Sequence, residues 1–495
     1  MPYKPSFGTI QSTGEPIESP RPDSPFRIAV LADFSGRRNR GLTDSSEQIA
    51  ARRQLRVSRD TLDEAMAKLG VELVIPVGDD AGTVSLSFAS LDDFHPDQLH
   101  DRVEPVADAY DSDEKSALMN SVLHHLDFQA LESAWRGVDW LLGRATKGSQ
   151  VEVVLFDVSL AELAADLKAS EDLTASGLHR LLIEKGVRGP KGAPWALLVG
   201  NYVFNLSGKH AELLGRLAKI ASQTNAPFLT TVNPQVLDKA FTLNPDAAPA
   251  WQALRQLPEA ALLGLAVPRF LLRQPYGENT QSIDKFSYEE MGQPPDRSHY
   301  LWGNPALACA ALAAQAFHKD GWGCKPGTVL ELDNLPIHVY TQDDEEEVTL
   351  AEAWLVRPQT EQLVKLGFMP FLCVKGKGAL QLLRFLSLAQ PGKDQVPCDI
   401  QGRWSVAGMA PAPRAAAAPR PKVGMVAQTP DPTAPAPTRA PAASAPAARA
   451  APAPAAPAAS APAPAEEPEP VAEEAAAPAE EEMDPDLAAL LKELE

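Results

Sequence analysis

The chain has 495 residues, a formal net charge of −20 and four cysteines. So acidic a surface repels phosphate backbones, and we expect no nucleic-acid binding; the short arginine clusters at 37–40 and 52–53 read as solvated loop charge. The first residues do not have the pattern of a signal peptide, and the cysteines form no CxxC pair. The sequence has no run of about 18 apolar residues, so we expect no direct membrane insertion. We therefore expect a cytoplasmic protein with reduced thiols.

The N-terminal part predicts a strand, a helix and a hairpin after an irregular start. Residues 1–24 are rich in Pro, Ser and Gly and predict a flexible lead-in. Phe26–Ala32 is mostly apolar and reads as a buried strand. Residues 58–69 place apolar side chains at helical spacing behind a serine N-cap. Two alternating runs, Leu73–Val77 and Thr83–Phe88, flank a Gly/Asp loop and predict a β-hairpin.

From about residue 120 the sequence predicts helices that alternate with apolar strands. The predicted strands are 151–157, 195–199 and 228–232, and the predicted helices are 128–138, 160–169, 210–222 and 303–318. This alternation favours the α/β fold class, with α+β as the alternative: mixed sheet layers with flanking helices.

The last part of the chain differs in composition. Residues 405–483 are dominated by Ala and Pro and predict a disordered linker. Residues 484–495 then predict a short amphipathic helix, whose apolar positions are Leu487, Leu490, Leu491 and Leu494. Two interpretations stay open: a helix that folds into a partner's groove, or a frayed end with accidental amphipathicity.

Sequence patterns for catalysis are missing. The chain contains no GxxxxGK[ST], GxGxxG, HExxH or GxSxG motif. His124 and His125 are adjacent, so on a helix they face different directions, and the acidic run 343–347 lacks the spacing of a cation loop. Glu289 and Glu290 resemble an acid pair, but nothing supplies a nucleophile. We therefore expect no enzyme, no cofactor and no metal.

Three motifs follow one another in the N-terminal part. The first is Asp33-Phe34-Ser35-Gly36-Arg37 after the strand, the second is Val57–Glu64, and the third runs from Leu86–Phe88 into Leu91–Asp97. In this order and spacing, about residues 25–105 resemble the small subunit of the type VI secretion contractile sheath. Asp33, Phe34 and Gly36 are the candidate structural or interface residues of this region.

A second series of motifs covers most of the remaining chain. FQxLExxWRG begins at residue 128, NYVF at 201, RFLLRQPYG at 269, LWGN at 301, NLP at 334 and LGFMP at 366. Together they resemble the large subunit of the same sheath over residues 120–404. Some of these side chains could equally anchor the core or brace loops. The candidate structural or interface residues are Phe128, Leu131, Glu132, Trp135, Arg136, Gly137, Arg273, Pro275, Tyr276, Gly277, Trp302, Gly303 and Asn304.

The resemblance implies a non-enzymatic structural protein of the type VI secretion system. Its sheet edges would exchange strands with neighbouring protomers. Its partners would be sheath subunits or further copies of itself, and in addition the tube protein, the baseplate and the ATPase that recycles the sheath.

This sequence departs from the family in two ways. The two subunits, ordinarily separate chains, are joined here near residues 100–120, and the segment that follows the point matching Pro397 in a large subunit is replaced by the Ala/Pro-rich sequence. Two hypotheses follow. The extent of the match favours a working sheath protomer. The replaced segment favours a non-polymerising accessory that binds a sheath end or the baseplate, with the C-terminal helix docking on a partner.

Overall fold

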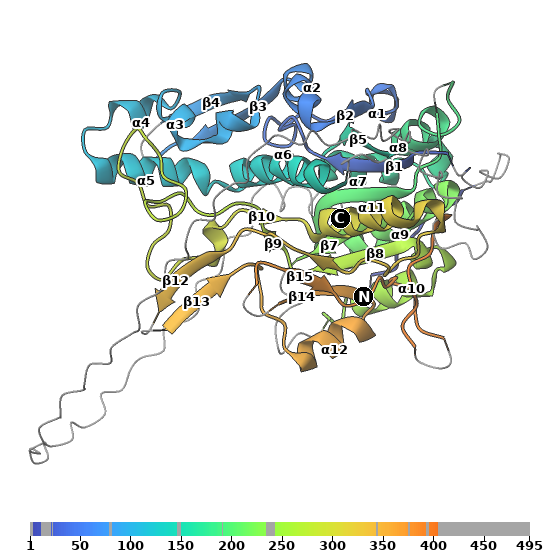
Figure 1. Cartoon of the computed structure of the whole chain (residues 1–495). Helices are drawn as coiled ribbons and strands as arrows, with labels where there is room; N and C mark the ends of the chain where they lie inside the picture. Colours follow the sequence, from blue (N-terminus) through green and yellow to red (C-terminus); the bar gives the residue numbers. More distant parts are fainter. Residues whose placement is uncertain are drawn as a thin grey trace, which may run out of the picture. The chain divides into compact units, whose positions relative to one another are not determined.

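The structure is a computed structural model (Figure 1) that describes residues 3–10, 21, 23–78, 82–145, 150–190, 192–233, 243–342, 345–374, 377–392 and 396–403. All of these belong to the first of two units into which the chain divides. The predicted linker 405–483 and the predicted helix with Leu487, Leu490, Leu491 and Leu494 lie outside the described residues.

A nine-stranded mixed sheet is the centre of the fold, in the order β11-β15-β14-β8-β7-β6-β1-β5-β2. The strands from β14 to β5 in this order run parallel, whereas β2 on one side and β15 and β11 on the other are antiparallel to their neighbours. The predicted mixed α/β fold is confirmed. The strands are β1 Phe26–Ala32, β2 Leu55–Val57, β5 Val151–Asp157, β6 Leu197–Phe204, β7 Phe228–Val232, β8 Leu263–Val267, β11 Glu331–Leu332, β14 Phe368–Cys373 and β15 Leu380–Leu382.

Within the described residues, three two-stranded ribbons accompany the sheet: β3 Val71–Pro76 with β4 Thr83–Phe88, β9 Phe270–Leu271 with β10 Trp302–Gly303, and β12 His338–Gln342 with β13 Glu345–Thr349. The α-helices are α1 Ser46–Ala51, α2 Leu62–Leu69, α3 Pro96–His100, α4 Glu104–Asp108, α5 Ser112–Leu123, α6 Leu126–Ala145, α7 Leu160–Lys168, α8 Gly177–His179, α9 Gly208–Thr224, α10 Ala248–Gln256, α11 Pro305–Asp320 and α12 Arg357–Lys365. In the part of the chain that is described, none of them is long and apolar enough to cross a membrane.

Strand β1 is buried on both faces, as expected for a central strand of a parallel sheet. Its side chains alternate between two cores. Phe26, Ile28 and Val30 belong to the core that includes α6 and α11, whereas Ala29 and Leu31 belong to the core that includes α7, α9 and α10. The sheet is therefore the middle layer between two layers of helices (Figure 1).

The region that resembles the small subunit shares this sheet with the rest of the chain. Strand β1 lies between β5 and β6 and pairs with both, so that Ile28 is opposite Val153 on one side and Leu197 on the other. Strand β2 pairs with the opposite side of β5. Without β1, strands β5 and β6 would have no common neighbour.

Residues 3–10 depart from the expectation of a flexible lead-in, because they pack along α9. Glycines at 208 and 215 leave room for the rings of Tyr3 and Phe7; a Cβ atom at Gly215 would lie 2.2 Å from the Phe7 ring. The Tyr3 hydroxyl donates to Glu212 over 2.7 Å. The Pro, Ser and Gly content of residues 1–24 did not reveal these two aromatic anchors.

Several element bounds differ from the predictions, and two of these differences have a clear structural cause. Strand β6 covers 197–204 and not 195–199, since it continues beside β7 after an irregularity in the register. Helix α11 begins at Pro305, two residues later than predicted, because the Asn304 side chain accepts the backbone N–H of Ala306 and caps the helix.

Candidate functional site

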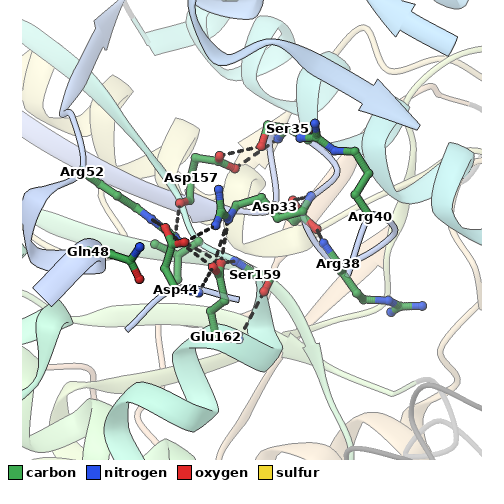
Figure 2. Close-up of polar contacts among 12 residues, drawn as sticks. Asp33, Ser35, Arg38, Arg40, Asp44, Gln48, Arg52, Asp157, Ser159 and Glu162 are labelled. Atoms are coloured by element: carbon green, nitrogen blue, oxygen red, sulfur yellow. Dashed lines mark hydrogen bonds and ion pairs between the residues drawn. The ribbon is translucent and has the colours of Figure 1, made fainter. Parts of the chain in front are cut away.

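The carboxyl ends of β1 and β5 hold a network of buried carboxylates (Figure 2). Asp157 is the last residue of β5 and lies opposite Ala32 at the end of β1. Its Oδ1 atom accepts the backbone N–H groups of Phe34 (2.8 Å) and Ser35 (3.1 Å), and its Oδ2 atom accepts the Ser35 hydroxyl (2.7 Å). Burial raises the pKa of Asp157, and these hydrogen bonds oppose the rise.

Asp33 closes the turn that follows β1. Its two carboxylate oxygens accept the backbone N–H groups of Arg37 (2.7 Å) and Arg38 (2.8 Å). Burial raises the pKa of Asp33 to about 6, although both hydrogen bonds lower it. Gly36 in the same turn has a φ of 74°, and a Cβ atom there would lie 2.2 Å from the backbone oxygen of Glu72. Only glycine fits this approach to β3.

Glu162 at the start of α7 carries the third carboxylate, whose side chain is fully buried. Arg37 donates to it over 3.0 Å, and Arg52 donates to both of its oxygens, one of them at 3.1 Å. Arg52 also pairs with Asp44 at 2.8 Å. Burial alone would raise the pKa of Glu162, but the Arg52 and Ser159 hydrogen bonds and the two arginine charges hold it below its ordinary value.

The location of this network matters because the strand order reverses at β1: the chain continues to β5 on one side and later to β6 on the other. In open α/β sheets this crevice commonly binds a ligand. Here each oxygen of the three carboxylates already accepts a hydrogen bond from the chain. The network therefore fastens residues 33–52 to β5 and α7. Among the described residues, no group of three or more His, Cys, Asp or Glu side chains could hold a metal ion.

A second buried network joins α6 to the loop after β9. Arg273 donates to Glu132 over 3.0 Å and bidentately to Glu290 over 2.7 and 3.0 Å. Arg136 donates to the same Glu132 oxygen at 2.6 Å and contacts the Tyr276 hydroxyl at 3.4 Å. The arginine charge holds the pKa of Glu290 at about 2 against the effect of its burial.

Apolar contacts connect the two networks. The Trp135 ring of α6 lies 5.1 Å from the Phe34 ring, and its Nε1 atom donates to the Phe34 carbonyl over 2.8 Å. Phe128 and Leu131 are buried on the same helix. Gly137 allows close packing, because a Cβ atom there would lie 2.6 Å from Leu307 of α11.

The remaining predicted residues lie around these networks. Gly277 packs against the Glu289 carboxylate, which also accepts the backbone N–H of Glu278, and Pro275 precedes Tyr276, whose backbone N–H donates to Glu290 over 2.7 Å. Trp302 and Gly303 form β10, and the Asn304 amide donates to the Tyr202 carbonyl over 3.1 Å. Asp33, Phe34 and Gly36 thus meet in the first network, and Glu132, Arg136, Arg273 and Tyr276 in the second.

Several charged residues lie in surroundings that differ from the sequence-based predictions. Arg37 and Arg52 belong to clusters interpreted as solvated loop charge, yet their side chains are only 16% and 11% exposed because they pair with the buried Glu162. Glu290 is the buried partner of Arg273. A capping box at Ser159 and Glu162 and a strand that ends in Asp157 were the available signals for the first network.

The protein is thus an α/β fold whose N-terminal strand lies inside the sheet and whose following segment is held by buried ion pairs. The family model VipB (EvpB/VC_A0108, tail sheath N-terminal domain) matches residues 112–387, more than half of the chain. The chain therefore belongs to this tail sheath family. A second family model, type VI secretion system VipA (VC_A0107 or Hcp2), matches residues 18–129. Both predicted resemblances are confirmed.

One known protein agrees with the family. The chain is 32% identical over 323 residues to the type VI secretion system sheath protein TssC1 of Pseudomonas aeruginosa strain PAO1, with 60% of this chain and 63% of that protein covered. The chain thus spans less than two thirds of this relative. A chain in a structure of the anti-feeding prophage baseplate aligns with 54% of this chain and 54% of its own length, at 13% identity. The TM-score of this alignment is 0.29, which is too low to support a conclusion.

Proposed function

We propose that this chain is a structural component of the type VI secretion system that acts through protein–protein contacts and not through catalysis. The arrangement of β1 supports this most strongly. A strand from the VipA-like region completes the sheet of the VipB-like region. The buried carboxylates at the end of that strand all accept hydrogen bonds from the chain and so hold the two regions together. Such a scaffold suits a cytoplasmic assembly of sheath subunits, copies of this chain, or both.

The resemblance extends the proposal to further partners. A sheath protomer would contact the tube protein and the baseplate, and the recycling ATPase would act on it. The work of contraction would come from repacking between metastable and stable arrangements, which needs no bond-making residue.

A second candidate function is a non-polymerising accessory that binds a sheath end or the baseplate. Its support is that the matched family model is an N-terminal sheath domain whose match ends at residue 387, and Ala/Pro-rich sequence follows. In this case the C-terminal segment with Leu487, Leu490, Leu491 and Leu494 would bind the partner.

Negative-stain electron microscopy of the purified chain distinguishes the two candidates. We would image the full chain and a variant that ends at Gly408, each alone and mixed with sheath subunits. Tubules formed by the chain alone would establish a sheath protomer. Particles that stay discrete at every concentration and decorate sheath ends would establish the accessory. Discrete particles that do not bind sheath subunits would contradict both candidate functions.

A further inference from the structure

Residues 3–10 lie along α9 as a bound peptide lies in a groove. The Tyr3 ring packs against Gly208, where a Cβ atom would come within 2.7 Å of it. Four residues later the Phe7 ring packs against Gly215, two turns and about 10 Å further along the helix axis. The segment therefore runs in the direction of α9, and its two rings enter successive gaps on one face of the helix.

Side chains of α9 bind the backbone of this segment. Arg216 Nε donates to the Ser6 carbonyl over 2.9 Å, and Lys219 Nζ donates to the Gly8 carbonyl over 2.6 Å. The Arg216 side chain is only 3% exposed, and its Nη1 atom also donates to the Leu167 carbonyl over 2.8 Å. The end of α7 thus helps to hold this guanidinium in place, and the carbonyl contacts suit the backbone of any extended peptide.

Two glutamates and one glycine add side-chain selectivity. The Tyr3 hydroxyl donates to Glu212 over 2.7 Å, and the Ser6 hydroxyl donates to Glu171 over 2.7 Å. A phenylalanine in the first ring position would leave the Glu212 contact unmade. Gly8 has a φ of 64°, a conformation that favours glycine after the second ring. The groove therefore favours the pattern tyrosine, three residues, phenylalanine, glycine.

The groove and the segment that fills it belong to different parts of the chain. Gly215 lies in the middle of α9, where glycine weakens a helix relative to alanine, so the ring that it admits explains its presence. Helix α9 lies inside the range 112–387 that the tail sheath model matches. Residues 3–10 lie outside both matched ranges. The groove is thus a feature of the sheath domain, whereas its ligand is not.

We propose that α9 carries a peptide-binding groove and that residues 3–10 fill it in cis as an autoinhibitory ligand. The partner is a protein that presents an extended segment with the same aromatic pattern. It competes with residues 3–10 for the gaps at Gly208 and Gly215. Because the cis segment is tethered, its effective concentration is high, and only a partner at high local concentration displaces it. This site is additional to the proposed structural function and exists whether or not the chain polymerises.

Fluorescence anisotropy with a labelled peptide of residues 3–10 tests the groove in the full-length chain. In the Y3A/F7A variant the cis segment loses both rings, so the peptide should bind saturably. The unchanged chain should bind it at least about tenfold more weakly, because its own segment competes. K4A is the matched control, since Lys4 is exposed and both rings remain; it should bind as weakly as the unchanged chain.

Addition of G215A to the Y3A/F7A variant locates the site. The new methyl group lies where the phenylalanine ring of the peptide must enter, so binding should weaken at least about tenfold. Alanine is also the better helix former, so α9 itself should not be weakened. Circular dichroism checks the fold of every variant.

Hydrogen exchange of the single variant G215A needs no peptide. In the unchanged chain the Thr9 N–H donates to the Glu171 carbonyl over 2.6 Å, and the Leu173 N–H donates to the Thr9 carbonyl over 2.9 Å. Because the methyl group displaces the Phe7 ring, both amides should exchange at least about tenfold faster in G215A.

Four results would overturn the proposal. Equal peptide binding by Y3A/F7A and the unchanged chain would show that residues 3–10 do not close the groove. A folded Y3A/F7A variant that binds no peptide would show that α9 has no separable peptide site. Equal binding with and without G215A would place the site elsewhere. If Y3A/F7A does not fold, unchanged exchange of the Thr9 amide in G215A would still refute the docking of the segment.

Discussion

Arg273 pairs with two carboxylates that the fold has removed from water. Its guanidinium is 6% exposed and contacts Glu132 and Glu290, whose side chains are 0% and 1% exposed. A buried ion pair contributes little net stability when it is complete, but a single remaining charge is costly. At the residue scale, the motif arginine is therefore a brace between α6 and the loop after β9.

Substitution of Arg273 by methionine should destabilise the fold by about 3–5 kcal/mol, because Glu290 would remain buried without its arginine and Glu132 would keep only Arg136. Urea unfolding followed by tryptophan fluorescence measures the change. R357M is the control, since Arg357 is 90% exposed in its pair with Glu361, and its midpoint should not move. Equal midpoints for both variants would contradict the role given to Arg273.

His210 should make stability depend on pH. Burial lowers its pKa from 6.5 to about 4, and its neutral Nδ1 accepts the Asn205 N–H over 2.6 Å. The unfolded chain binds more protons between these values, so the contribution is complete above pH 6.5 and is lost as the pH falls towards 4, by at most about 3 kcal/mol.

Thermal unfolding of H210Q between pH 7 and pH 4 checks this effect. A glutamine oxygen can accept the Asn205 N–H at every pH, so the variant should lose less stability on acidification than the unchanged chain. H318Q, which changes an exposed histidine, serves as the control. The same slope in all three proteins would show that His210 does not titrate as described.

At the scale of elements, the turn after β1 depends on glycine for two reasons. Gly36 and Gly70 both have positive φ values, 74° and 62°, but only Gly36 lies against another backbone. G70A should cost about 1–2 kcal/mol from backbone strain alone. G36A should cost about 1–3 kcal/mol more, because the Glu72 carbonyl must move.

Denaturant midpoints of the two glycine variants give the comparison directly. A larger loss for G36A supports the close approach of the turn to β3. A loss no larger than that of G70A would mean that the turn does not touch β3 in solution.

The sequence predicted where single strands begin and end better than it predicted which strands pair with each other. Strands β1, β5 and β7 begin and end at the predicted residues, because each is an apolar run that stops at a polar or turn residue. Periodicity carries no information about pairing, so it did not place β1 between β5 and β6. Charge in sequence was also ambiguous: Arg52 reads as solvent-exposed until its partner Glu162, 110 residues later, is known.

At the scale of the whole molecule, joining two subunit-like regions in one chain makes their pairing intramolecular. This raises the effective concentration of β1 for its position between β5 and β6 without any new contact. The connection lies between α4 and α5, where Tyr110 is 98% exposed. The motifs predicted this joining, but the shared sheet is what makes the two regions one fold.

Cleavage of this connection is the sharpest test of the shared sheet. A protease site placed at residues 109–111 of the full chain would be cut, and the product analysed by size-exclusion chromatography with and without urea. We predict that the two fragments elute together in native buffer and separate only in denaturant, since β1 and the buried carboxylates hold them. Separation in native buffer would contradict the shared sheet and the structural role built on it.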